Sequence, residues 1–119
     1  MSKRIAIKEA KKSNFTRAPM GAAVWKSGRV LGRGFNQIRG SRLKEKRWNC
    51  SLHAEQAAIL DSLKSDIKGA TLYVIRLNPK GLFRNACPCS ICKRLIESVG
   101  IKEVIYTNEN GDWVKWTIK

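Results

Sequence analysis

Residues 88–100 read PCSICKRLIESVG and give the chain its clearest helix. Apolar residues recur there at helical spacing, and Gly100 stands where a helix commonly ends, so a helix is predicted over residues 89–99. Cys89 and Cys92 are three residues apart at the start of this helix, which points both sulfurs the same way. The positive end of the helix dipole is expected to favour their thiolate forms.

Strands are predicted on both sides of this helix. The strand predicted at 71–76 contains the run Leu72-Tyr73-Val74-Ile75, which is apolar on both faces, as in a central strand, and residues 102–107 follow the helix after a short turn. Another turn, residues 108–112, leads into residues 113–118, where apolar and polar side chains alternate. Because that turn is short, the last two strands are expected to form an antiparallel hairpin.

The first half of the chain predicts two more helices, a hairpin and a basic loop. The helices cover 2–13 and 52–64, the strands cover 20–25 and 29–35, and the loop covers 36–50. Asn49 or Ser51 is expected to cap the helix at 52–64. Helices that alternate with strands indicate a three-layer α/β/α sandwich over a five-stranded mixed sheet, within a single domain, residues 1–119.

Charge and cysteine content limit the partners and the chemistry. The 119 residues include 24 Lys and Arg against 9 Asp and Glu, a net charge of +15, and such a field attracts polyanions. We therefore predict a phosphate-bearing partner. No apolar run is long enough to cross a membrane, and the basic N-terminus lacks an apolar signal segment, so a cytoplasmic protein without a membrane partner is expected. In that setting a Cys-x-x-Cys pair indicates a metal or redox site.

A second motif, His53-Ala54-Glu55, stands at the start of the helix predicted over 52–64. Together with Pro88-Cys89-x-x-Cys92 it forms the H-x-E…P-C-x-x-C signature known for zinc-dependent nucleobase deaminases. The chain therefore resembles the cytidine deaminase superfamily, whose five-stranded fold has a similar order of elements. His53 is the only histidine of the chain, and the resemblance requires one histidine.

The resemblance implies a reaction and a metal. His53, Cys89 and Cys92 would hold Zn²⁺ with one position left for water, and Glu55 would shuttle protons during hydrolysis of cytosine to uracil. A nucleic-acid-binding module with a structural zinc is the alternative from a different class. Glu55 speaks against it, because a structural site favours a fourth protein ligand.

Five further residues are predicted to contact the substrate. By the same resemblance, Asn36 would bind the sugar, the N–H of Ala54 the pyrimidine ring, and the carbonyl of Cys87 the departing amine. An ordinary loop asparagine is the competing interpretation of Asn36. Arg47 and Trp48 lie in the basic loop, where they could hold a nucleic-acid backbone and stack on a neighbouring base.

The last hairpin is similar to that of the free-cytidine, blasticidin-S and several toxin-type deaminases. Two departures argue against a free nucleoside as the substrate. Ile38 stands where those enzymes carry a glutamate for the ribose, and His53 replaces their cysteine. Single-stranded nucleic acid is therefore the first expectation and a deoxycytidylate or cytidine nucleotide the second. The oligomeric state stays open at this point: the hairpin branch often forms tetramers, and in a homo-oligomer Trp113 is the candidate contact residue.

Overall fold

The computed structural model describes residues 2–13, 18–39 and 50–118. The helices are α1 (Ser2–Ala10), α2 (Ala54–Ser62) and α3 (Ser90–Ser98). The strands are β1 (Met20–Lys26), β2 (Arg29–Phe35), β3 (Gln37–Arg39), β4 (Cys50–Leu52), β5 (Thr71–Leu77), β6 (Phe83–Arg84), β7 (Glu103–Thr107) and β8 (Trp113–Thr117). Among the described helices, none has the length and apolar character needed to cross a membrane.

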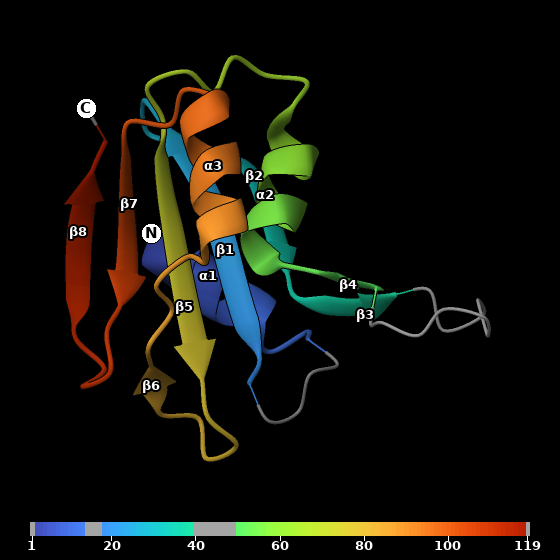
Figure 1. Ribbon diagram of the computed structural model, residues 1–119, viewed down its shortest axis with the longest axis vertical. Coiled ribbons are helices and arrows are strands. Elements are labelled where there is room, and N and C mark those ends of the chain that lie inside the picture. Colours follow the sequence, from blue (N-terminus) through green and yellow to red (C-terminus); the bar gives the residue numbers. More distant parts are fainter. Residues whose placement is uncertain (1, 14–17, 40–49, 119) are drawn as a thin grey trace.

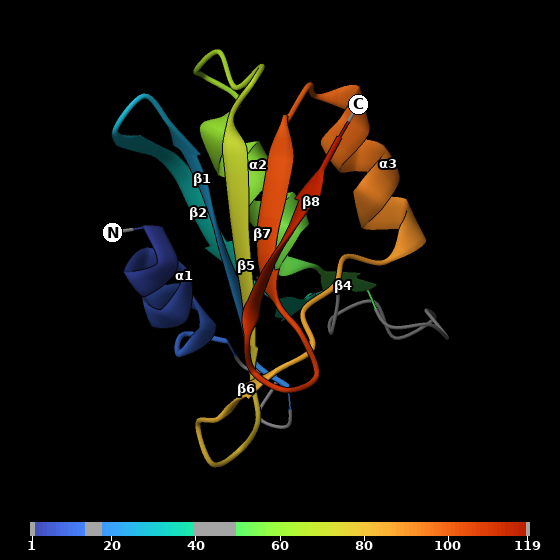
Figure 2. The same ribbon diagram turned by 90° about the vertical axis from the view of Figure 1, so that its left-hand side faces the viewer.

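The elements form three layers, as predicted. The main sheet has the order β2-β1-β5-β7-β8, with β6 paired to β5 (Figure 1). The β5–β7 pair is parallel and the other pairs are antiparallel, so the sheet is mixed and β7 and β8 form the predicted hairpin. α1 covers one face, while α2 and α3 cover the other (Figure 2).

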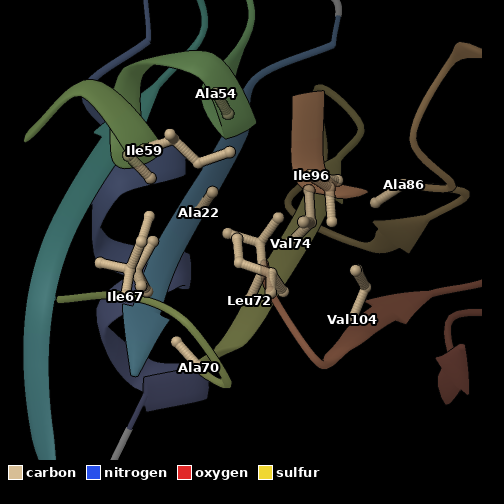
Figure 3. Close-up of a cluster of buried hydrophobic side chains, with 13 residues drawn as sticks. Ala22, Ala54, Ile59, Ile67, Ala70, Leu72, Val74, Ala86, Ile96 and Val104 are labelled. Carbon is tan, nitrogen blue, oxygen red and sulfur yellow. The ribbon is translucent and has the colours of Figure 1, made fainter. Parts of the chain in front are cut away.

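Buried side chains lie on both faces of the sheet, which explains why the run 72–75 is apolar on both faces. The larger cluster lies between the sheet and the layer of α2 and α3 (Figure 3); its members include Ala22, Val24, Ala58, Ile59, Leu72, Val74, Ala86, Ile96 and Val104. A smaller cluster packs under α1; it consists of Ala6, Ala10, Ile75 and Leu77.

Short elements and helix ends differ from the predictions. β6 and the separate β3–β4 ribbon were not expected, because strands of two or three residues depend on their partners more than on their own sequence. Leu52, predicted to be helical, belongs to β4. The predicted cap by Asn49 or Ser51 is wrong, since His53 caps α2 and its N–H donates to Oε1 of Gln56 at 2.9 Å.

Gly32 marks a close approach between β2 and α2. A Cβ built on it would lie 2.5 Å from the carbonyl oxygen of Ala58 and 2.6 Å from Cβ of Ser62. Gly32→Ala is therefore expected to lower the free energy of unfolding by about 3 kcal/mol through overpacking. Gly28→Ala provides the comparison: its Cβ would meet open space but its φ is +79°, so a loss of about 1 kcal/mol is expected. Urea denaturation measures both; equal losses would contradict the packing argument.

Candidate functional site

The residues of the two motifs meet where two helices begin. His53 is the N-cap of α2, Cys89 is the N-cap of α3, and Cys92 lies in the first turn of α3. The two helices lie side by side on the same face of the sheet and start at the same end (Figure 1). Residues 36 or more positions apart in the sequence are thereby brought into one site.

The three side chains have the spacing of metal ligands. Nδ1 of His53 lies 3.2 Å from Sγ of Cys92 and 3.7 Å from Sγ of Cys89, and all three ligand atoms lie within 4.8 Å of one another. Tetrahedral Zn²⁺ with bonds of about 2.0 Å to nitrogen and 2.3 Å to sulfur holds its ligand atoms roughly 3.5–3.8 Å apart. The set fits zinc, and among the described residues no fourth side chain joins it, which leaves one coordination position for a non-protein ligand.

The thiol of Cys92 needs a cation to ionise. The side chain is fully buried, and burial, followed by the nearby charge of Glu55, raises the pKa of this thiol above its usual range. The predicted stabilisation of the thiolate by the start of the helix does not prevail over burial. Since zinc binds thiolate rather than thiol, metal binding is expected to release this proton.

Glu55 is a buried carboxyl group beside the ligands. Its side chain is 2% exposed, and Oε1 has no hydrogen-bond partner among the described residues. Burial raises the pKa of Glu55 from 4.5 to about 7. A buried polar atom without a partner is costly, so it indicates a site built for a group that the chain itself does not supply. A carboxyl group with a pKa near 7 can both accept and donate a proton at neutral pH.

This burial predicts a pH dependence of stability in the zinc-free protein. Below pH 4.5 Glu55 is protonated in both the folded and the unfolded state, and its ionisation carries no cost. Above about pH 7 it is ionised in both states, and the folded state is destabilised by up to about 3 kcal/mol. Glu55→Gln is therefore expected to be the more stable protein at pH 8, with an advantage that shrinks as the pH falls from 7 to 4.5. Urea titrations of chelated protein test this; an advantage that does not change with pH would contradict it.

Asn36 is tied to its own chain. Its Oδ1 accepts from the N–H of Met20 at 2.8 Å and also from the hydroxyl of Ser13, and its Nδ2 donates to the carbonyl of Ala18 at 3.0 Å. These bonds use both lone pairs of the oxygen and one amide hydrogen. The side chain holds β2 to the chain that leads into β1. Binding of the sugar by Asn36 stays a prediction.

The other predicted substrate contacts have different positions. Ala54 is the first residue of α2 and is fully buried, so its backbone N–H belongs to the first turn, where helical N–H groups lack partners within the helix. Cys87 precedes α3 and is itself exposed, between the buried residues Ala86 and Pro88, and its own N–H donates to Oδ1 of Asn85 at 3.1 Å. Arg47 and Trp48 lie outside the described residues, so their predicted roles stay predictions.

Gln56 is one residue that the sequence analysis missed. It stands three positions after His53, the spacing of a capping box, and this pattern was available in the sequence. Its bond to the backbone of His53 fixes the start of α2, and with it the residue that carries the imidazole.

Comparisons with known proteins agree with the geometry. The sequence model of the cytidine and deoxycytidylate deaminase zinc-binding region matches residues 2–108. A deoxycytidylate deaminase of Mycobacterium phage D29 is 32% identical over 126 residues, covering 89% of this chain and 91% of that protein.

Solved structures show the same fold. The apo crystal structure of dCMP deaminase from cyanophage S-TIM5 has a TM-score of 0.67 and 31% identity, and the match covers 91% of this chain and 80% of that one. Its complex with dCMP and dUMP has a TM-score of 0.57 and 28% identity over 87% of this chain and 78% of that one. The resemblance predicted from the two motifs is confirmed: the chain belongs to the family of zinc-dependent cytidine and deoxycytidylate deaminases.

Proposed function

We propose that the protein deaminates a cytosine nucleotide, with dCMP as the preferred substrate and dUMP and ammonia as products. The observation that carries the reaction is the buried carboxyl group of Glu55, whose Oε1 has no partner among the described residues, beside three residues with zinc-ligand spacing. Support for the substrate comes from the D29 relative, named for deoxycytidylate, and from the S-TIM5 relative, solved in complex with dCMP and dUMP. These relatives favour a nucleotide over the single-stranded nucleic acid expected first.

The chain's own groups account for binding and proton transfer. His53, Cys89 and Cys92 would hold Zn²⁺, which when bound supplies a Lewis acid that makes water a nucleophile near neutral pH. Glu55 takes the proton of that water and delivers it to the ring nitrogen. The water oxygen bonds to the ring carbon that bears the amino group. The proton left on this oxygen passes through the same carboxyl group to the amine, the C–N bond breaks as the carbonyl group of uracil forms, and ammonia leaves.

Backbone groups at the two helix starts would orient the base. The N–H of Ala54 would contact the pyrimidine, and the carbonyl of Cys87 would accept a hydrogen bond from the departing amine. Both residues lie next to a zinc-ligand motif, which supports these roles. The burial of Glu55 keeps bulk water from competing for its proton.

A substrate panel tests the proposal. Cytidine, deoxycytidine, CMP, dCMP, and single-stranded DNA and RNA are supplied at equal cytosine concentration, and deaminated product is measured by mass spectrometry. We expect kcat/KM for dCMP to exceed that for deoxycytidine by about 10–100-fold, the value of one charge-assisted contact to a phosphate. Comparable turnover of both monomers would overturn the nucleotide assignment.

Single-stranded nucleic acid is the second candidate, and the net charge of +15 is the observation that favours it. If single-stranded DNA or RNA is deaminated faster per cytosine than dCMP, single-stranded nucleic acid becomes the first candidate substrate. In that case the double variant Arg47→Ala with Trp48→Ala is expected to lose binding to a long oligonucleotide and to keep activity on dCMP. Unchanged activity of this variant on oligonucleotides would exclude the basic loop as the binding surface.

A further inference from the structure

The three predicted zinc ligands are not equally supported by the fold. His53 is fixed by the capping bond to Gln56, and Cys92 is fully buried on a helix. Cys89 is exposed and stands at the junction between α3 and the stretch 84–88. The geometry of the site therefore depends on what holds this stretch in place.

Thr107 holds the stretch from the end of β7. Its side chain is fully buried, and its hydroxyl donates to the carbonyl of Arg84 at 2.6 Å. Its own carbonyl accepts from the N–H of Ala86 at 2.7 Å. Thr107 is the last residue of β7 and pairs with Trp113 of β8, so the hairpin holds its backbone in place.

Little conformational freedom remains between residues 84–86, which Thr107 holds, and the predicted ligand Cys89. Ala86 is 1% exposed and belongs to the core cluster (Figure 3). Only Cys87 and Pro88 separate it from Cys89. Pro88 is buried and has its φ fixed by its ring, while the N–H of Cys87 is bonded to Asn85. A displacement of residues 84–86 would therefore be passed on to the sulfur of Cys89.

We propose that Thr107 is a positioning residue for the metal site. Its hydroxyl and its carbonyl fix the stretch 84–88 so that Cys89 meets His53 and Cys92 at ligand spacing. The inference rests on the proposed function in taking these three residues as the zinc ligands, but it does not depend on which substrate is deaminated. Thr107 touches no ligand and acts through the backbone, so the loss of one hydrogen bond is expected to weaken metal affinity about 2–10-fold.

The test measures zinc affinity by competition with a chromophoric chelator in the absence of substrate. Thr107→Val keeps the shape of the side chain and removes the hydroxyl, and we expect it to bind zinc about 2–10-fold more weakly. Thr107→Ser keeps the hydroxyl and is expected to bind like the original protein. Unchanged affinity in Thr107→Val, or an equal loss in Thr107→Ser, would overturn the proposal.

Ser62→Ala is the matched control. Ser62 is 1% exposed and its hydroxyl donates to the carbonyl of Ile59 at 2.7 Å, at the end of α2 away from His53. This variant also loses one buried hydroxyl bond, but its zinc affinity is expected to stay unchanged. An equal weakening in Ser62→Ala would show that zinc affinity merely follows stability, and the proposal would fail.

Two further arms keep the outcome decisive. If Thr107→Val does not fold, Asn85→Ala takes its place, because Asn85 is exposed and its loss should not endanger the core. That variant is expected to weaken zinc binding in the same direction, and no change would count against the proposal. Failure of dCMP turnover with the Thr107 effect intact would overturn the proposed function and leave the positioning role standing.

Discussion

Glu55→Gln is expected to lower kcat for deamination by about 10³-fold or more while the zinc content stays unchanged. The amide has nearly the same shape as the carboxyl group but cannot take the proton of the attacking water or pass it on. The side chain is 2% exposed, so bulk solvent cannot easily replace it. Product formation by mass spectrometry and metal analysis of the same samples give the two readouts.

Glu97→Gln is the control for this substitution. Glu97 lies on α3, the helix that starts with Cys89, but its side chain is exposed. The Glu97→Gln substitution removes the same charge without touching the site, and kcat is expected to stay within about twofold of the original value. A Glu55→Gln protein that keeps a tenth or more of the activity would show that another group transfers the proton.

Cys92→Ser is expected to remove zinc and activity together. Its thiol lies 3.2 Å from Nδ1 of His53, closer than that of Cys89, and a serine hydroxyl is a far poorer ligand for zinc than a thiolate. Zinc content should fall from about one per chain to near zero, because the remaining pair cannot hold the ion. Metal analysis after dialysis and the rate of dUMP formation measure the change.

Cys87→Ser is the matched control for the loss of a thiol. Cys87 is an exposed free cysteine only two residues from Cys89, but it is not part of the ligand group. It should keep both its zinc and its activity. Loss of zinc in this variant, or retention of zinc in Cys92→Ser, would contradict the assignment of the ligands.

The sequence predicted the elements that carry a repeated pattern. The helix at 89–99 has apolar residues at regular spacing and the strand at 71–76 has a continuous apolar run, and both lie within a residue of the observed bounds. The antiparallel hairpin of β7 and β8 followed from the short turn between them. The motif residues came together because each begins a helix on the same face of the sheet.

Features that depend on distant partners could not be predicted in this way. The hydrogen bond from Thr107 to Arg84 joins residues 23 positions apart, and no local pattern in the sequence predicts it. The same holds for Asn36, whose amide is used by Ser13, Ala18 and Met20. The net charge indicated an anionic partner but carried no information on its size. Single-stranded nucleic acid was expected before a mononucleotide because Arg47 and Trp48 in the basic loop were interpreted as contacts to a nucleic-acid backbone and base.

Because the predicted zinc ligands come from two helix starts, a bound ion would also cross-link the chain. His53 and Cys89 are 36 positions apart, and a zinc ion that joins them closes the intervening segment into a loop. If such a link behaves like a disulfide, loop-closure entropy alone contributes about 4 kcal/mol by restricting the unfolded chain. Removal of zinc by a chelator would then remove this constraint, and the beginnings of α2 and α3 would loosen together. In a chain of 119 residues, the zinc ion would thus raise the free energy of unfolding in addition to its proposed catalytic role.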